Sequence, residues 1–247
     1  MTSFFSKIFS HKTRKKQPLL VDIHSHLIPG IDDGVKTTFE AVKLIREFEW
    51  MGYKKLIITP HIMSHRYKNS SQIILEKLEF LKDALADHEI KIELEAASEY
   101  YLDDYFMTLL EKRDILTFND NHLLFEMSYT RAPTDLIDMI FEIEQSGYQP
   151  VLAHPERYVF MHNHFDEYKN LKEFGVLFQV NINSLAGYYN RQVQKIAQKL
   201  ADEGMIDFVG SDTHKARQVE MLKEYIKTPQ WQKIFEKNPI RNNELLK

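Results

Sequence analysis

The sequence contains no cysteine, and this absence excludes several kinds of chemistry. Thiolate nucleophiles, thiolate metal ligands and disulfide bonds are all ruled out, so any catalytic mechanism has to use other groups. A chain without cysteine also fits a reducing compartment.

Long apolar runs and a strong charge imbalance are missing as well. No stretch approaches the ~18 apolar residues of a membrane-spanning helix, and the N-terminus lacks the apolar core of a signal peptide. We therefore expect a cytoplasmic protein. The 32 basic and 36 acidic residues leave a net charge of -4, which gives no reason to expect a nucleic-acid partner. An anionic substrate would need positive charge gathered locally.

The 247 residues, 43% of them hydrophobic and 12% aromatic, can bury one sizeable core. Single α/β barrels commonly have about 250 residues. We therefore expect one domain, over residues 19–247.

The first 18 residues differ from the rest and form a predicted N-terminal extension. Apolar side chains come first, at Phe4, Phe5, Ile8 and Phe9, and a basic run over residues 11–16 follows. This order is typical of a short amphipathic helix that makes weak peripheral contact with an anionic membrane. The alternative is a flexible, solvated tail, because short isolated helices are only marginally stable in water.

Beyond the extension, short apolar runs alternate with amphipathic segments. The apolar runs predict seven strands, at Leu19–Ile23, Lys55–Thr59, Ile92–Ala97, His122–Phe125, Pro150–Ala153, Leu177–Ile182 and Asp207–Gly210. The amphipathic segments predict helices at Thr38–Met51, Ser71–Ala86, Thr134–Gln145 and Gln192–Ala201. Repeated strand–helix units predict a parallel sheet, and seven of them favour a distorted (β/α)7 TIM-like barrel of the α/β class over a doubly wound sheet.

Nearly every predicted strand ends in a residue that can bind a metal ion. The first strand ends in His24 and His26, and the next loop carries the adjacent carboxylates Asp32 and Asp33. The later strands end in His61, Glu99, Glu126, His154, Asp212 and His214. Because the C-terminal ends of parallel strands meet at one face of a barrel, we expect these side chains to surround one pocket.

A single histidine or glutamate at a strand end is usually a hydrogen-bonded structural group. Five histidines and four carboxylates at corresponding ends would instead be buried charges without partners, at a cost on the order of several kcal/mol per ion. Bound metal ions remove that cost. The mixed nitrogen and carboxylate set suits Mn²⁺, Fe²⁺ or Zn²⁺ and argues against calcium. From the residues alone, either Asp32 or Asp33 could be the ligand contributed by their loop.

The ordered set of motifs resembles the polymerase and histidinol phosphatase (PHP) superfamily. Within it, the chain is similar to the manganese-dependent bacterial tyrosine phosphatases of capsule and exopolysaccharide operons. The motifs that carry the resemblance are D-I-H-S-H-L-I-P-G-I-D-D-G, T-P-H, S-E-Y-Y-L-D-D-Y, F-E-M, A-H-P-E-R-Y, Q-V-N-I-N-S-L-A-G and S-D-T-H. Two positions depart from the usual pattern, since Ile62 replaces a frequent second histidine and Gly210 a frequent alanine.

The resemblance implies three divalent metal ions, with manganese favoured. Their implied ligands are His24, His26, Glu99 and Asp212 for the first ion, the bridging Glu99 with Glu126 and His154 for the second, and Asp33, His61 and His214 for the third. The choice of Asp33 over Asp32 comes from the family. Arg157 matches the family's phosphate-binding arginine in H-P-E-R.

Residues beside these motifs could line the pocket and contact the substrate. The candidates are Tyr158, Asn181, Asn183, Tyr188 and Tyr189, although such residues near strand ends more often pack or form turns. His162 and His164 also form a histidine pair, but they follow no strand, so we predict them to be surface residues. His65, His88 and His122 have no comparable support.

Charge predicts the class of substrate. Four carboxylates with three divalent ions leave a site charge of about +2, which attracts a phosphomonoester dianion. We expect a metal-bound hydroxide to attack phosphorus in line while Arg157 stabilises the phosphoryl oxygens. A phenol leaving group, with a pKa near 10, departs more readily than an alkyl alcohol and favours phosphotyrosine.

The resemblance implies as partner a phosphotyrosine protein, namely a membrane-anchored bacterial tyrosine kinase of polysaccharide synthesis. Two alternatives remain open. One is a phosphatase of a small phosphomonoester such as histidinol phosphate, against which the D-D-G and S-L-A-G segments count. The other is a catalytically silent protein that binds a kinase tail, for which we would expect lost ligands; here all nine are present.

Overall fold

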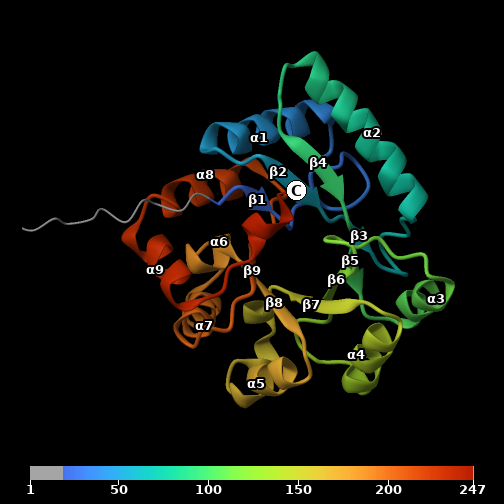
Figure 1. Ribbon diagram of the computed structural model, residues 1–247, viewed down its shortest axis with the longest axis vertical. Helices are drawn as coiled ribbons and strands as arrows, with labels where there is room; N and C mark the ends of the chain where they lie inside the picture. Colours follow the sequence, from blue (N-terminus) through green and yellow to red (C-terminus); the bar gives the residue numbers. More distant parts are fainter. Residues whose placement is uncertain (1–18, 247) are drawn as a thin grey trace, which may run out of the picture.

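The computed structural model describes residues 19–246. Figure 1 shows its strands arranged in a ring, with the helices packed around the outside. The N-terminal extension, for which we predict membrane contact, lies outside the described residues. Within them, no helix has the length and the apolar character needed to cross a membrane.

Parallel strands form two sheets that follow one another around the ring. The first contains β1 (Val21–Asp22), β2 (Lys55–Ile58) and β4 (Glu93–Ala96), in that order. The second contains, in order, β3 (His61–Ile62), β5 (Glu99–Tyr101), β6 (His122–Glu126), β7 (Gln149–Ala153), β8 (Leu177–Asn181) and β9 (Phe208–Gly210). The chain passes from β2 to β3, and from β4 to β5, in two residues, so nine strands occupy seven positions.

A seam between the first and last positions completes the ring. Ser25 and Thr213 form a parallel bridge. The backbone N–H of Asp212 donates to the carbonyl of His24 at 2.7 Å, and the N–H of His26 donates to the carbonyl of Thr213 at 2.9 Å. The predicted α/β barrel of seven strand positions is thereby confirmed. Its distortion lies where β2 and β4 break, and Pro60 at the first break cannot donate to a ladder.

All four predicted helices are present, and several others were not predicted. The predicted ones are α1 (Thr38–Met51), α2 (Ser71–Asp87), α4 (Leu136–Gln145) and α7 (Arg191–Asp202), with α4 beginning two residues later than expected. The others are α3 (Asp104–Lys112), α5 (Asp166–Glu173), α6 (Ile182–Leu185), α8 (Ala216–Tyr225), α9 (Pro229–Lys237) and the 3₁₀ turns η1 (Pro155–Arg157), η2 (Val159–Met161) and η3 (Asn242–Leu245).

Local sequence explains why α1 forms in the segment that follows β1. The Thr37 side chain accepts from the N–H of Glu40, and the Glu40 carboxylate accepts from the N–H of Thr37, which is a capping box. Gly52 ends the helix in the left-handed conformation with φ 98°. Ile45 and Phe48 face the core, so the helix presents its polar side outward.

Apolar side chains fill both the inside of the ring and the layer beneath the helices. Inside the ring lie Val21, Ile23, Ile57, Ala97, Phe118, Leu124, Val151, Ala153, Phe208 and Leu245. Strand alternation then decides which residues reach the site. On β6, Leu123 and Phe125 pack outward under the helices, while Leu124 faces inward and Glu126 continues that inner face at the strand end.

The C-terminal turn η3 closes the other end of the ring. The side-chain amide of Asn242 donates to the carbonyls of Val21 at 3.0 Å and Val209 at 2.7 Å, and its carbonyl accepts from the N–H of Val209 at 3.0 Å. Asn243 accepts from the N–H of Leu20 at 2.8 Å. Neutral amides therefore satisfy the backbone around the start of β1.

Candidate metal centre

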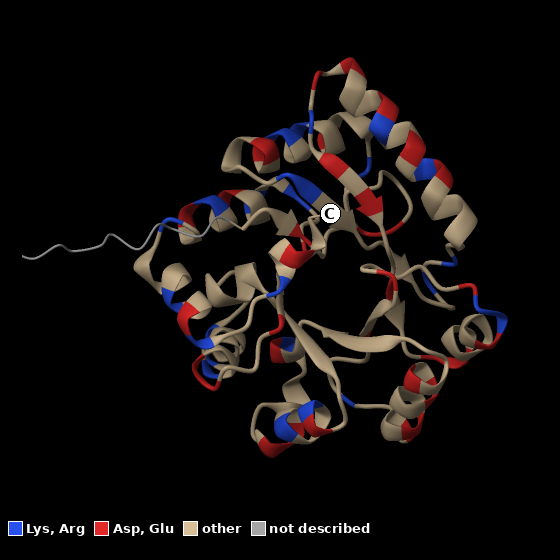
Figure 2. Cartoon of the chain, in the orientation of Figure 1, with Lys and Arg blue, Asp and Glu red and all other residues tan. Residues whose placement is uncertain are grey.

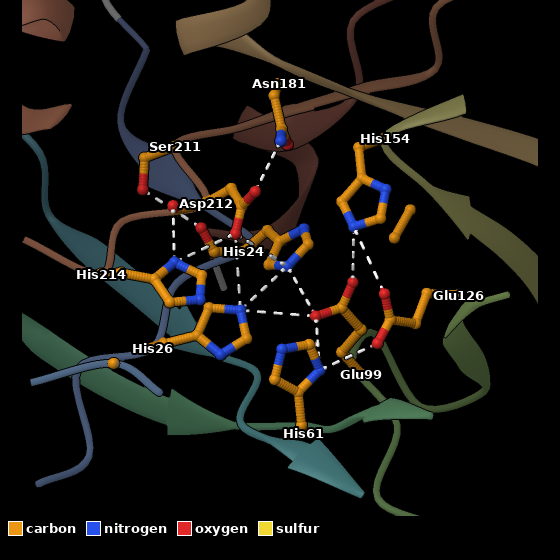
Figure 3. Close-up of polar contacts among 12 residues, drawn as sticks. His24, His26, His61, Glu99, Glu126, His154, Asn181, Ser211, Asp212 and His214 are labelled. Atoms are coloured by element: carbon orange, nitrogen blue, oxygen red, sulfur yellow. Dashed lines mark hydrogen bonds and ion pairs between the residues drawn. The ribbon is translucent and has the colours of Figure 1, made fainter. Parts of the chain in front are cut away.

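All nine predicted ligands gather at the C-terminal ends of the strands, and Figure 3 labels each of them except Asp33. Among the described residues they form four overlapping groups whose ligand atoms lie within 4.8 Å of one another. The groups are His24–His26–Asp212, His24–Glu99–His154, His61–Glu99–Glu126 and His26–Asp33–His61–His214. Each mixes imidazole nitrogen with carboxylate oxygen, as transition-metal sites do.

Glu99 lies at the middle of these groups. Its Oε2 is 3.2 Å from His24 Nε2 and 3.1 Å from His61 Nδ1, and its Oε1 is 2.8 Å from His154 Nε2. Burial raises the pKa of Glu99, but His24 and His61 outweigh burial and hold it well below its usual range.

Two of these buried atoms, Glu99 Oε2 and His61 Nδ1, make no hydrogen bond despite being close together. A bound cation would satisfy both, so the residues present fit a metal centre.

Asp212 connects the histidines of the centre to Arg157. Its Oδ1 lies 3.6, 3.5 and 3.4 Å from nitrogens of His24, His26 and His214. Burial raises the pKa of Asp212, yet His24 and the hydrogen bond from His26 lower it well below the usual value. The residue adopts a φ of 49°, which non-glycine residues rarely do and which is frequent at functional sites.

The other oxygen of Asp212 is held by three donors. Asn181 Nδ2 donates at 2.7 Å, the hydroxyl of Tyr189 at 3.0 Å and Arg157 Nη1 at 3.0 Å. These bonds fix the carboxylate so that its Oδ1 faces the histidines. Asn181 therefore acts by orienting Asp212.

The geometry separates the two adjacent aspartates that sequence alone left open. Asp32 is buried, and its Oδ2 accepts from His26 Nδ1 at 2.7 Å and from the N–H of His61 at 3.2 Å. Burial raises the pKa of Asp32, but His26 outweighs it and lowers the value to about 2. The Oδ1 of Asp33, by contrast, lies 3.4 Å from both His61 Nε2 and His214 Nε2. Asp32 therefore orients the imidazole ring of His26, and Asp33 faces the group of candidate ligands that contains His61 and His214.

Two glycines allow the close packing around the histidines. A Cβ on Gly34 would lie 2.0 Å from the carbonyl oxygen of His26, so only glycine fits after the two aspartates. A Cβ on Gly210 would lie 2.7 Å from the side chains of both Gln179 and His24. Gln179 in turn bonds His24 Nδ1 at 2.6 Å and fixes that ring. The departure from alanine at Gly210 therefore has a local packing reason.

Arg157 stands over the metal groups between two aromatic rings. Its guanidinium carbon is 4.5 Å from the ring centroids of both Tyr129 and Tyr189. Together they border a pocket whose lining also includes His61, Glu99, His154, Tyr188, Asp212, His214, Lys215 and Gln218. The pocket thus offers a clamped cation and flat aromatic surfaces directly beside the cluster of ligands.

The other predicted substrate residues have different surroundings. Tyr158 does not line this pocket: its side chain is fully buried, and its hydroxyl donates to the carbonyl of Ala153 at 3.1 Å. The chain turns between β7 and Tyr158, through His154 with a φ of 35° and the 3₁₀ turn η1. Asn183 is also buried and donates to the carbonyl of Ser211 at 2.9 Å, which supports the end of β9. Tyr188 lies at the pocket.

Sequence reasoning missed Tyr129 and Gln179. The available signals were an aromatic residue three positions after Glu126 and two polar residues, Gln179 and Asn181, on the inner face of an otherwise apolar strand. His162 bonds the carbonyl of Glu156 at 2.9 Å and belongs to none of the four groups. His164, His65, His88 and His122 are also outside them.

Comparison with known proteins gives a consistent picture. A family model described as capsular polysaccharide synthesis, CpsB/CapC, matches residues 20–241. Tyrosine-protein phosphatase YwqE of Bacillus subtilis is 28% identical over 199 residues, or 80% of this chain and 78% of that protein. Tyrosine-protein phosphatase CpsB of Streptococcus agalactiae is 26% identical over 201 residues, or 79% of this chain and 83% of that protein.

Two solved structures are similar to this chain, one in both sequence and fold and the other in fold alone. The first comes from a study of YwqE of Bacillus subtilis and CpsB of Streptococcus pneumoniae, which are described there as metal-dependent tyrosine phosphatases. It superposes with a TM-score of 0.79 at 26% identity and covers 92% of this chain and 94% of that one. The lactonase Lmo2620 of Listeria monocytogenes, at a TM-score of 0.54 and 12% identity, shares the fold alone.

Proposed function

The chain belongs to the CpsB/CapC family of capsular polysaccharide synthesis, and we propose from this premise that it is a metal-dependent phosphatase of phosphotyrosine in proteins. The observation that carries the proposal is the pocket itself. Arg157, clamped between Tyr129 and Tyr189, lies beside the four ligand groups and suits a phosphoryl group. The aromatic walls suit the phenyl ring attached to it.

We propose three divalent ions, with Mn²⁺ first and Fe²⁺ or Zn²⁺ as alternatives. His24, His26, Glu99 and Asp212 would hold one, Glu99, Glu126 and His154 the second, and Asp33, His61 and His214 the third. Contacts of 2.8 to 3.9 Å among these side chains support one shared centre, and the division among the three ions follows the family resemblance.

His61 faces two of these groups at once. Its Nε2 is 3.4 Å from Asp33, and its Nδ1 is 3.1 Å from both Glu99 and Glu126. Nδ1 makes no hydrogen bond in this structure, so it is available to an ion shared with the two glutamates, while Nε2 faces the group that contains Asp33.

The ions, when bound, lower the pKa of water and neutralise phosphoryl charge. The protein's own groups do the rest. Arg157 uses one guanidinium nitrogen for Asp212, which leaves its remaining donors for phosphoryl oxygens. Tyr129 and Tyr189 keep the guanidinium in place by stacking. Because phenols have a pKa near 10, the leaving group needs little protonation, and no strong acid is required in the pocket.

The test is metal removal followed by substrate comparison. Chelation should abolish hydrolysis of a phosphotyrosine peptide and Mn²⁺ should restore it, since four carboxylates without cations repel a dianion. Histidinol phosphate, the small phosphomonoester alternative, should be turned over far more slowly than the peptide. Full activity in a verified metal-free preparation would overturn the proposal, and faster turnover of histidinol phosphate would replace the substrate class. Metal-loaded protein that binds the peptide without cleaving it would support the silent binding protein.

For the partner we propose a membrane-anchored tyrosine kinase of polysaccharide synthesis, whose phosphorylated tail this enzyme resets in the cytoplasm. The family description and the names of the relatives support a phosphotyrosine protein of capsular polysaccharide synthesis as the substrate. The basic and apolar residues of the N-terminal extension would bring the enzyme close to that membrane. Comparing the full chain with one starting at Leu19 on anionic vesicles tests this part. Equal co-sedimentation would remove the membrane contact without affecting the phosphatase assignment.

A further inference from the structure

A second groove adjoins the catalytic pocket. His214 and Lys215 line both hollows. From there the groove runs past the start of α8 and along the first turns of α1, where Phe39 and Lys43 lie on its wall. The two helices pack side by side at this edge of the ring (Figure 1). A polypeptide leaving the pocket on this side would therefore enter the groove.

The charge available to a ligand in this groove is positive. Its two acidic residues are already engaged: Glu40 accepts from the N–H of Lys36 at 2.9 Å in the cap of α1, and Asp33 faces the histidines of the metal groups. Lys43 is exposed, and its ammonium has no hydrogen bond or ion pair within residues 19–246. Over the outer helices generally, basic and acidic residues are mixed (Figure 2).

Phe39 provides an apolar contact next to that free cation. It is 76% exposed, although large aromatic side chains are usually buried. Phe39 and Lys43 are four positions apart on α1, so they lie on one face, separated by about 6 Å along the helix axis. An extended peptide covers about 3.3 Å per residue and repeats its side-chain direction every second residue. Two alternate residues of one extended segment therefore match Phe39 and Lys43.

We propose that this groove binds the segment that flanks the phosphotyrosine in the protein substrate. It selects an apolar residue facing Phe39 and, two positions farther from the phosphotyrosine, an acidic residue facing Lys43. The inference rests on the proposed phosphatase function and adds to it a sequence preference outside the pocket. Lys215 lines both hollows and Lys36 bonds the carbonyl of Asp32 at 2.7 Å, so neither is a clean probe.

The experiment compares Lys43→Glu and Phe39→Ser with the wild-type full chain in Mn²⁺. The substrates are free phosphotyrosine, a phosphotyrosine peptide with the apolar and acidic residues, and the same peptide with lysine in place of the acid. We expect Lys43→Glu to lower kcat/KM for the acidic peptide about fivefold and to improve the lysine peptide, while free phosphotyrosine stays within about twofold. Phe39→Ser should reduce both peptides equally. Lys77→Glu on α2, exposed and outside the groove, is the control with the same charge change.

The outcomes separate the groove from the pocket. An unchanged ratio of peptide to free phosphotyrosine, or a Lys43→Glu variant that behaves like Lys77→Glu, overturns the groove while leaving the phosphatase intact. A dimer that Phe39→Ser dissociates without changing that ratio would make the face an interface between copies and would also overturn it. Failure of the wild-type enzyme on free phosphotyrosine and both peptides would instead overturn the proposed function itself.

Discussion

The two ends of the barrel both bury polar groups, but they do so in opposite ways. At the closed end, the neutral side chain of Asn242 makes three hydrogen bonds to the backbone, one with the carbonyl of Val21 and two with the carbonyl and N–H of Val209. At the open end, histidines and carboxylates crowd around Glu99, and atoms such as His61 Nδ1 remain without a hydrogen bond. Around Asn242 the backbone of the closed end is satisfied by protein groups alone, whereas the open end needs cations to complete it.

Glu99→Gln should break this contrast most strongly. The amide keeps the shape of the side chain but removes the charge shared by the metal groups, so we expect activity to fall by roughly a thousandfold with loss of bound metal. Metal analysis and phosphotyrosine turnover measure both effects. Glu93→Gln, the same change on β4 where Glu93 pairs with Lys55 at the surface, is the control and should leave both unchanged. Full metal content in Glu99→Gln would contradict the central role.

Arg157→Ala should separate substrate binding from metal binding within the open end. We expect activity to fall by about 10² to 10³ with the metal content unchanged, because the guanidinium is proposed to hold phosphoryl oxygens. Arg157→Lys keeps the charge without the planar fork and should recover only part of the loss. If Arg157→Ala loses metal, its contact with Asp212 would be the more important one, and the residue would be structural.

Asn242→Ala should affect the closed end alone. Three backbone groups lose their partners, so we expect the free energy of unfolding to fall by about 2 to 3 kcal/mol and Tm by about 5 to 10 °C. The kcat on phosphotyrosine should not change, since the site lies at the opposite strand ends. Thermal unfolding beside Asn163→Ala, an exposed asparagine in a turn, gives the control. A drop in kcat at temperatures where the variant is folded would show that the ends are coupled.

The sequence predicted the barrel because its strands are buried on both faces and therefore appear as short apolar runs. It did not predict α5, whose eight residues bury only Tyr168 and Leu171, so the apolar periodicity is too weak to detect. The break after β2 was equally hidden. Pro60 was visible, but its effect depends on the neighbouring strand path and not on local preference.

The clustering of the candidate ligands at the open end could be predicted because strand ends converge in any parallel barrel. The residues alone could not choose between Asp32 and Asp33, because both lie in one loop, and the choice of Asp33 came from the family resemblance. The contacts of Asp32 with His26 and His61 separate the two in the structure. Tyr129 and Tyr158 illustrate the same limit. Their roles depend on how the chain turns after distant strands, which no local pattern records.

The seam between β1 and β9 makes the metal centre a product of folding the whole chain. Asp22 and Ser211 bond across it although 189 positions separate them. Closing a loop of this length is slow, and a polypeptide that ends before β9 would lack Asp212 and His214. Ions that bind the closed ring and not the open chain shift the folding equilibrium toward closure by linkage. The ions that take part in the reaction would then also hold the barrel closed.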